Sequence, residues 1–318
     1  MANLYDIFSS RNDEIEEQLP SVVAVAESSD PAQDLVEDLI QWLEEEKIEP
    51  PRKPGLHCSS LWKTCARKIL LQEQYKDHLE PEVLKAGSHM TFGEGHALHD
   101  LMQNKYLGPF GRLIGDWKCL QCQSVTYQGT MPSECPTCKV AWLDMNDGHQ
   151  NVVYCELFAK DDELDYCGHC DGILYGRDMV TKRVFEFKTI SKAGYAALRR
   201  PESSHVVQVH AYMNAFGLDE AILLYWDKAS QADWSIDRDG NFVATNPHLK
   251  SYLVKFDNKL WAEIAARIVD HHKAVEQIRR LPVIKGADVM KFTRICVHSK
   301  CDLAKACDVK HYCFKLPG

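Results

Sequence analysis

Thirteen cysteines constrain this chain more than any other feature. They stand in short, spaced groups along a chain of 318 residues. A chain of this length can bury a hydrophobic core without cross-links, and cysteines in a reducing compartment stay as thiols. Metal ligation is therefore a better interpretation of the cysteines than a disulfide framework.

Two of these groups are CxxC pairs, Cys119-x2-Cys122 and Cys135-x2-Cys138, which are separated by twelve residues. Each pair can present two thiolates along one edge of a tetrahedron, and the gap suits a hairpin that brings the pairs together. Four thiolates leave no open coordination position. The spacing thus predicts structural zinc in a zinc ribbon over residues 117–142, where it would order the segment or present a surface to DNA or a partner.

Four further cysteines lie near the end of the chain. Their spacing is Cys296-x4-Cys301-x5-Cys307-x5-Cys313. On spacing alone, these thiols are compatible with a second zinc site.

The composition is that of an ordinary soluble globular protein. Hydrophobic residues make up 45% of the chain and charged residues 26%, which excludes collagen-like, coiled-coil and wholly disordered classes. The apolar runs are too short for a membrane span, and the start of the chain is acidic where a secretory signal would be basic. We therefore expect a cytoplasmic protein.

The net charge of −9 is unevenly distributed. Residues 1–55 hold 14 acidic side chains against four basic ones, a balance of −10, so the remainder of the chain is close to +1. The body of the protein is therefore not repelled from DNA by its own charge. Within the acidic segment, four apolar residues at helical spacing predict a short amphipathic helix: Leu35, Leu39, Ile40 and Leu43. We interpret residues 1–55 as an appendage and favour a solvated arm over a partner-docking or DNA-mimicking lid.

Beyond residue 55, segments with the hydrophobic spacing of a helix alternate with segments typical of strands. Helical spacing predicts helices over residues 59–74, 93–106, 206–216 and 258–280. Strand-like segments cover residues 152–158, 172–175, 184–189 and 221–226. This order predicts an α/β fold in which helices flank a mixed sheet.

Charged residues on two of the predicted strands form a candidate site. Asp171 stands at the start of one strand, and the next strand carries Glu186 and Lys188 two positions apart. Period-two alternation places Glu186 and Lys188 on one face and Phe185 and Phe187 on the other. Two carboxylates form a hard oxygen site suited to Mg²⁺ or Mn²⁺, beside which a lysine can orient or deprotonate water.

Residues before and after these strands extend the pattern. Gly95 and His99 lie four residues apart on the upstream helix, and Gln208 and Tyr212 share one face of the downstream helix. The ordered set Gly95-x3-His99, Asp171-Gly172, Glu186-Phe-Lys188 and Gln208-x3-Tyr212 resembles the PD-(D/E)xK nuclease superfamily. The resemblance is to its RecB-like branch, which includes the exonuclease of CRISPR adaptation and the nuclease domain of AddB.

This resemblance covers roughly residues 56–315 and implies a restriction-endonuclease-like nuclease domain over residues 56–318. It implies that His99, Asp171 and Glu186 bind the divalent metal and that Lys188 assists the attacking water. Gln208 and Tyr212 would position the DNA strand. The zinc ribbon is not a general feature of the family, and Cys170 stands where the family usually has an apolar residue. Glu156 is either an accessory acid of the site or a structural surface residue.

The same resemblance implies a [4Fe–4S] cluster that ties the two ends of the domain together. Family members often use one cysteine before the core and three after it, which here assigns Cys65 with Cys301, Cys307 and Cys313. Cys296 competes for one of these places, and zinc is the rival metal.

The sequence as a whole predicts a Mg²⁺- or Mn²⁺-dependent DNA exonuclease of recombination, repair, replication or phage DNA processing. DNA is the expected partner, together with other replication or recombination proteins. The alternative is a non-catalytic DNA-binding or partner-recruiting module that functions through its zinc ribbon.

Overall fold

The computed structural model describes residues 31–45, 55–79, 85–143, 150–229, 234–236, 242–244 and 248–317. The chain divides into two compact units, Met1–Ile48 with Leu84–Ala86, and Glu49–Val83 with Gly87–Gly318. The predicted 1–55 appendage falls largely outside the described residues, and its boundary at residue 55 stays a prediction. In the described part of the chain, no helix is both long and apolar enough to cross a membrane.

The first unit contains the helix α2 (Pro31–Glu45), which has no basic residue in its last turn. It lies where the sequence predicts an acidic amphipathic helix. The Leu43 side chain of this helix is buried, whereas those of Leu39 and Ile40 are exposed.

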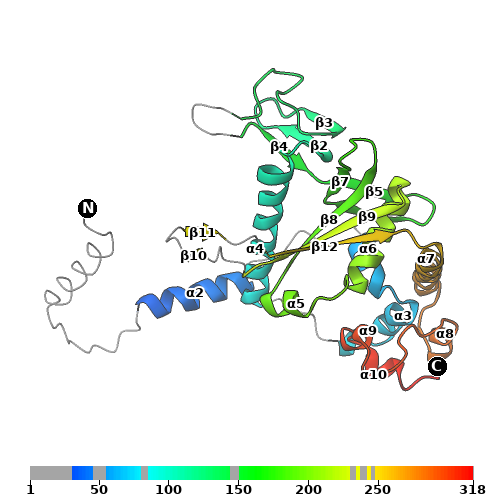
Figure 1. Cartoon of the computed structure of the whole chain (residues 1–318). Coiled ribbons are helices and arrows are strands. Elements are labelled where there is room, and N and C mark those ends of the chain that lie inside the picture. Colours follow the sequence, from blue (N-terminus) through cyan, green and yellow to red (C-terminus); the bar gives the residue numbers. More distant parts are fainter. Residues whose placement is uncertain are drawn as a thin grey trace, which may run out of the picture. The chain divides into compact units, whose positions relative to one another are not determined.

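A seven-stranded mixed sheet forms the centre of the second unit (Figure 1). Its strands follow the order β12-β9-β8-β7-β2-β3, with β4 also paired to β2. Their bounds are β2 Leu113–Cys119, β3 Val125–Gly129, β4 Val152–Cys155, β7 Gly172–Tyr175, β8 Lys182–Ile190, β9 Glu220–Asp227 and β12 Leu249–Lys255. β8 and β9 are parallel, and the other pairs are antiparallel. The predicted fold class, a mixed sheet flanked by helices, is confirmed.

A smaller sheet branches from the main one at the candidate site. It contains β1 (Leu56–His57), β6 (Tyr166–Cys170) and β5 (Leu157–Asp161), with β6 in the middle. β6 continues through Asp171 directly into β7, so that single residue joins the two sheets. A separate hairpin pairs β10 (Trp234–Ile236) with β11 (Phe242–Ala244).

Helices cover both faces of the main sheet. On one face, α6 (Ser203–Phe216) and the 3₁₀ helix η1 (Cys58–Lys63) share a core with Val184, Leu223 and Tyr225. On the other, α4 (Ala86–Asp100) continues into a π-helical segment, η3 (Leu101–Leu107), whose Met102 packs in a core with Phe185 and Phe187. The alternation along β8 thus sends its phenylalanines and its charged residues to opposite faces. The short helix α5 (Lys192–Ala197) precedes α6.

The beginning and the end of the domain share a second core. Leu70 and Leu71 of α3 (Ala66–Gln74) pack in one cluster with Ala274 of α7 (Asn258–Arg280) and with Val309. The remaining short helices are η2 Lys76–His78, α8 Gly286–Val289, α9 Asp302–Lys305 and α10 Lys310–Cys313. In Figure 1, α3 lies beside α9 and α10, although they are more than two hundred residues apart in the chain.

Two predicted elements differ from the observed ones. The helix predicted over residues 59–74 is broken at Thr64–Cys65, where the backbone is extended, and forms η1 and α3 instead. The strand predicted over residues 152–158 is interrupted at Glu156 and forms β4 and β5, which join different sheets.

Candidate functional site

Asp171 lies where the two sheets meet. Its Oδ2 accepts a hydrogen bond of 2.7 Å from the backbone N–H of Phe187, and its side chain is buried. Gly172 follows it with φ of +149°, and a Cβ there would lie 2.4 Å from Leu113 Cδ1 and 2.8 Å from the Tyr154 hydroxyl. Only glycine suits both the conformation and the space. The Asp-Gly pair therefore turns the strand and fixes the carboxylate against β8.

Glu186 and Lys188 project from β8 toward α6. Lys188 Nζ lies 2.7 Å from Glu186 Oε1 and donates to Gln208 Oε1 at 3.0 Å. Gln208 Nε2 donates to the same Glu186 oxygen at 2.9 Å and to the Tyr212 hydroxyl at 3.1 Å. Tyr212 in turn donates to the backbone carbonyl of His169. Gln208 thus holds the carboxylate and the ammonium together.

His99 and Glu156 bring two further ligand groups to Asp171. His99 Nδ1 lies 3.1 Å from Asp171 Oδ1, and the imidazole packs edge-on against Phe187 at a centroid distance of 4.9 Å. One ligand atom each from His99, Glu156 and Asp171 lies within 4.8 Å of the others. The structure therefore brings the predicted His99 and Asp171 together with Glu156. The predicted Glu186 and Lys188 form a second pair on β8, held by Gln208.

The charges in this cluster perturb one another. Burial and the neighbouring Asp171 raise the pKa of Glu186 to about 7, although Lys188 opposes the shift. Burial lowers the pKa of Lys188, but the Glu186 and Asp171 carboxylates outweigh it, so the net pKa is raised and the ammonium stays charged. Burial likewise lowers the pKa of His99, and its hydrogen bond to Asp171 reverses this into a net rise. Burial and Asp171 raise the pKa of Glu156.

Glu186 also carries an orphaned oxygen. Its Oε2 is buried and has no hydrogen-bond partner among the residues that the structure describes. A buried carboxylate oxygen without a partner is costly. A hard cation bound to Glu186 would satisfy this oxygen, and the ligand atoms of His99, Glu156 and Asp171 lie close enough to share one such ion, so the residues present fit a divalent metal.

Three buried residues that the sequence analysis did not select complete the site. Gln103 Nε2 and the Tyr154 hydroxyl both donate to the backbone carbonyl of Asp171, at 3.2 and 2.8 Å. Asn104 Oδ1 accepts from the backbone N–H of Tyr154 at 2.7 Å. Gln103 and Asn104 lie in the π-helical segment, a kind of irregularity that is frequent at functional sites. The one signal in the sequence was that Gln103 follows His99 at helical i+4 spacing.

Two open hollows meet at this cluster. One, of about 650 Å³, is lined by residues that include His99, Asp171 and Lys228. The other, of about 710 Å³, is lined by residues that include Ser59, Gln208 and Tyr212. Glu156 and His169 line both. The candidate site is therefore accessible from two sides.

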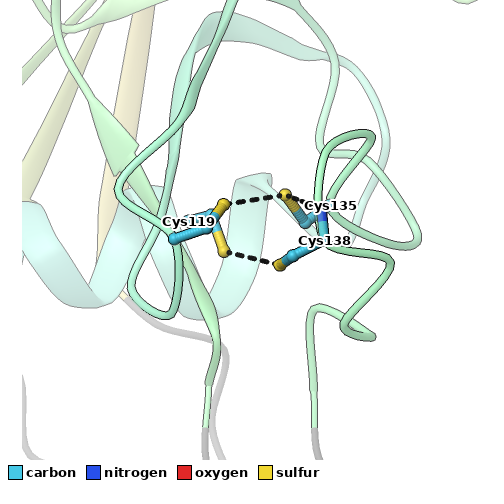
Figure 2. A group of neighbouring side chains, drawn as sticks. Cys119, Cys135 and Cys138 are labelled. Atoms are coloured by element: carbon cyan, nitrogen blue, oxygen red, sulfur yellow. Dashed lines mark hydrogen bonds between the residues drawn. The ribbon is translucent and has the colours of Figure 1, made fainter.

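The four cysteines of the two CxxC pairs converge at the end of β2. One ligand atom from each lies within 4.8 Å of the others. The sulfur atoms of Cys119 and Cys138 are 3.6 Å apart, as are those of Cys122 and Cys135, and Figure 2 shows the thiols of Cys119, Cys135 and Cys138 pointing toward one another. This group can bind a metal ion.

The two pairs have the same local geometry. The residue after each second cysteine is left-handed, with φ of 62° at Gln123 and 61° at Lys139. The N–H of each of these residues donates at 2.9 Å to the carbonyl of the first cysteine of its pair. The backbone N–H of Cys138 and the Ser124 hydroxyl lower the pKa of Cys135 to about 5, which favours the thiolate that a metal requires.

The remaining predicted ligands gather between α3 and the C-terminal helices. Cys65, Cys296, Cys307 and Cys313 line a small cavity of about 30 Å³, together with basic residues such as Lys68. Cys301 does not line this cavity, but its thiol interacts with that of Cys296. The structure thus brings Cys65 to the C-terminal cysteines.

The protein is thus a mixed α/β protein with a buried cluster of carboxylates and a lysine beside two open hollows. It also has a separate group of four cysteines. Neither a protein-family profile nor a curated protein sequence matches the chain.

Three solved structures show similarity at low identity. SSO0001 is 14% identical, with coverage of 88% of this chain and 96% of its own and a TM-score of 0.37. The alkaline exonuclease LHK-Exo of Laribacter hongkongensis is 11% identical, with coverage of 77% and 95% and a TM-score of 0.36. A phage-related exonuclease of Haemophilus somnus 129PT is 12% identical, with coverage of 71% and 96% and a TM-score of 0.38.

Proposed function

We propose that this protein is a divalent-metal-dependent DNA exonuclease. The observation that carries the proposal is a buried pair of carboxylates beside two open hollows: Asp171 contacts His99, and Glu186, which pairs with Lys188, keeps one oxygen without a hydrogen-bond partner among the described residues. The order of these residues along the chain is also the order that the PD-(D/E)xK resemblance requires.

His99, Asp171 and Glu186 are the residues that would hold Mg²⁺ or Mn²⁺. When bound, the cation would supply Lewis-acid polarisation of a phosphodiester and neutralise charge on its oxygens. The protein contributes a rigid set of ligands, because Asp171 is fixed by Phe187 and Glu186 by Gln208. Glu156 adds a third carboxylate next to Asp171 and His99.

Lys188 would act on the attacking water and on the phosphate. Its ammonium is charged and is held in place by Glu186 and Gln208. A fixed ammonium can orient water by a hydrogen bond and stabilise negative charge that develops during in-line displacement. Gln208 and Tyr212 then act mainly by positioning Lys188 and Glu186, which refines the role in strand positioning that the resemblance implies.

The two cysteine groups would serve structure. We propose zinc for Cys119, Cys122, Cys135 and Cys138, because four thiolates within 4.8 Å suit one tetrahedral ion with no open position.

We propose a [4Fe–4S] cluster for the C-terminal group. A cluster binds each thiolate at a different iron and so holds its ligands farther apart than a single zinc ion does. Cys65, Cys307 and Cys313 line one cavity, and Cys301 is the assigned fourth ligand, with Cys296 as its competitor. Such a cluster would tie α3 to the C-terminal segment.

The decisive experiment is digestion of linear DNA labelled at either end, with Mg²⁺ and Mn²⁺ compared. We expect metal-dependent release of nucleotides by the wild type and none by Asp171→Asn. Asp162→Asn is the matched control, since Asp162 is an exposed aspartate paired only with Lys160 in the described structure. DNA binding without cleavage by the wild type would instead support a non-catalytic DNA-binding module.

A further inference from the structure

An exposed aromatic pair lies beside the carboxylate cluster. Phe158 of β5 is 53% exposed, although its neighbours Leu157 and Ala159 are in the core. It pairs across the strands with His169 of β6, which is also exposed, at a ring centroid distance of 5.3 Å. These rings contribute little to the core. Their exposure makes them available to a ligand.

The strand register places this pair next to the acidic residues. Phe158 stands opposite His169 and Leu157 opposite Cys170, so Glu156 and Asp171 come one step further along the same two chain segments. The ligand atoms of Glu156 and Asp171 meet within 4.8 Å. Glu156 lines one hollow with Phe158 and His169, and it lines the other with His169 and Asp171. The aromatic pair therefore lies next to the proposed metal ligands.

The surroundings of the pair suit a flat, polar-edged ligand. Phe158 and His169 line the hollow of about 710 Å³, whose other walls include Ser59, Gln208 and Tyr212. A nucleobase combines an apolar face with polar edges, and stacking on aromatic side chains is tolerant of base identity. The Tyr212 hydroxyl donates a hydrogen bond to the His169 carbonyl and accepts one from Gln208. Tyr212 therefore links the backbone at His169 to the residue that holds Glu186 and Lys188.

We infer that Phe158 and His169 form a stacking site for an unpaired nucleobase next to the scissile phosphate. A base stacked in this hollow cannot at the same time remain stacked in a duplex, so the favoured substrate is a single strand or a frayed end. This inference rests on the proposed nuclease function and names its substrate class.

Binding to DNA with and without the relevant base tests the site. Full-length protein is titrated into labelled single-stranded oligonucleotides, with Ca²⁺ in place of Mg²⁺ so that binding is measured without cleavage. Each oligonucleotide carries a normal or an abasic nucleotide at its 5′ or its 3′ end. Stacking on one aromatic residue corresponds to about 5- to 150-fold in affinity. We expect the wild type to prefer the normal nucleotide at one of the two ends by a factor in this range.

Substitutions then assign the preference to the pair. Phe158→Ala should bind the normal end as weakly as the abasic one, with binding of the abasic end unchanged, and Phe158→Trp should restore the preference. Phe110→Ala is the matched control, because Phe110 is 61% exposed and does not line either hollow as the structure describes them.

The outcomes separate this inference from the proposed function. Suppose that the wild type cleaves DNA with Mg²⁺ or Mn²⁺. If it then shows no preference for the normal over the abasic end, or if Phe158→Ala keeps that preference, the stacking site is wrong and the nuclease function stands. A wild type that cleaves with neither metal overturns both.

Discussion

Lys188 Nζ and Glu186 Oε1 lie 2.7 Å apart on one face of β8, and both are largely buried. Gln208 bonds to each of them, so the ammonium and the carboxylate form one unit that α6 holds against the sheet. Gln208, which holds the pair, also lines the hollow of about 710 Å³.

Replacement of Lys188 by Gln should reduce the rate of the chemical step while divalent-metal binding persists. The loss should be about 10²- to 10³-fold, the usual cost of removing one fixed donor that stabilises charge in the transition state. Single-turnover digestion measures the rate, and calorimetric titration with Mn²⁺ measures binding. Lys160→Gln, at an exposed lysine, should match the wild type. A Lys188→Gln enzyme with the wild-type rate would remove Lys188 from the mechanism.

Two hydrogen bonds to the Asp171 carbonyl should prove non-additive. Gln103→Leu and Tyr154→Phe each remove one donor and leave the other, so each should lower the free energy of unfolding by about 0.5–1.5 kcal/mol. The double variant leaves the carbonyl without either donor and should cost more than the sum of the two. Urea denaturation of the four proteins measures the coupling. Strict additivity would mean that the two side chains do not act on a shared acceptor.

Loss of the proposed zinc site should weaken the pairing of β2 with β4. Cys119 ends β2, the strand that pairs with Tyr154 of β4 and with β7 next to Asp171. Cys135→Ser should therefore lose one zinc ion per chain, become sensitive to protease in this region and digest DNA more slowly. Zinc analysis and limited proteolysis test this, with Cys155→Ser as the control. A Cys135→Ser protein that retains full zinc would exclude Cys135 as a ligand.

The C-terminal cysteines should hold iron. Anaerobically purified protein should be brown and contain iron and sulfide, and Cys313→Ser should be colourless and unstable because Cys313 lies in the core shared with α3. Comparison of Cys296→Ser with Cys301→Ser identifies the fourth ligand, since only the true ligand's loss lowers the iron content. Zinc in place of iron in the anaerobic wild type would contradict the cluster.

The buried Glu186 carboxyl should make the metal-free protein less stable as the pH rises. Its pKa is raised from 4.5 to about 7 in the folded state, so the folded protein binds the additional proton between these values. The unfolding free energy should fall by roughly 1–3 kcal/mol from pH 4.5 to 7 and level off above it.

Urea denaturation without added Mg²⁺ or Mn²⁺ measures this dependence, and Glu186→Gln should reduce the slope. A slope unchanged by the substitution would assign the pH dependence to other groups. Added Mn²⁺ should restore stability at pH 8 in the wild type alone.

The sequence predicted the geometry of the site correctly where regular spacing of residues determines the local structure. Alternation along residues 184–189 predicted that Glu186 and Lys188 share a face opposite Phe185 and Phe187, and the structure has that arrangement. The CxxC spacing likewise anticipated the meeting of four thiols.

The irregular features of the site were beyond such patterns. Residues 152–158 are a run of apolar residues interrupted only by Glu156, and one charged residue in such a run does not by itself indicate that two sheets divide there. Gln103 and Asn104 resemble surface residues of a helix, and only the π-helical segment and the partners on β4 and at Asp171 make them interior. Such features depend on tertiary contacts that no short window of sequence contains.

The pairing of β2 with β4 has one more consequence. Cys119 stands opposite Val152, and the N–H of Leu120 donates to the carbonyl of Asn151, so the intervening residues leave and re-enter the core at adjacent points. The same segment contains β3, which pairs with β2 at the edge of the main sheet. A metal ion held by the four cysteines would therefore order this edge of the sheet as well as the loops that carry the thiols.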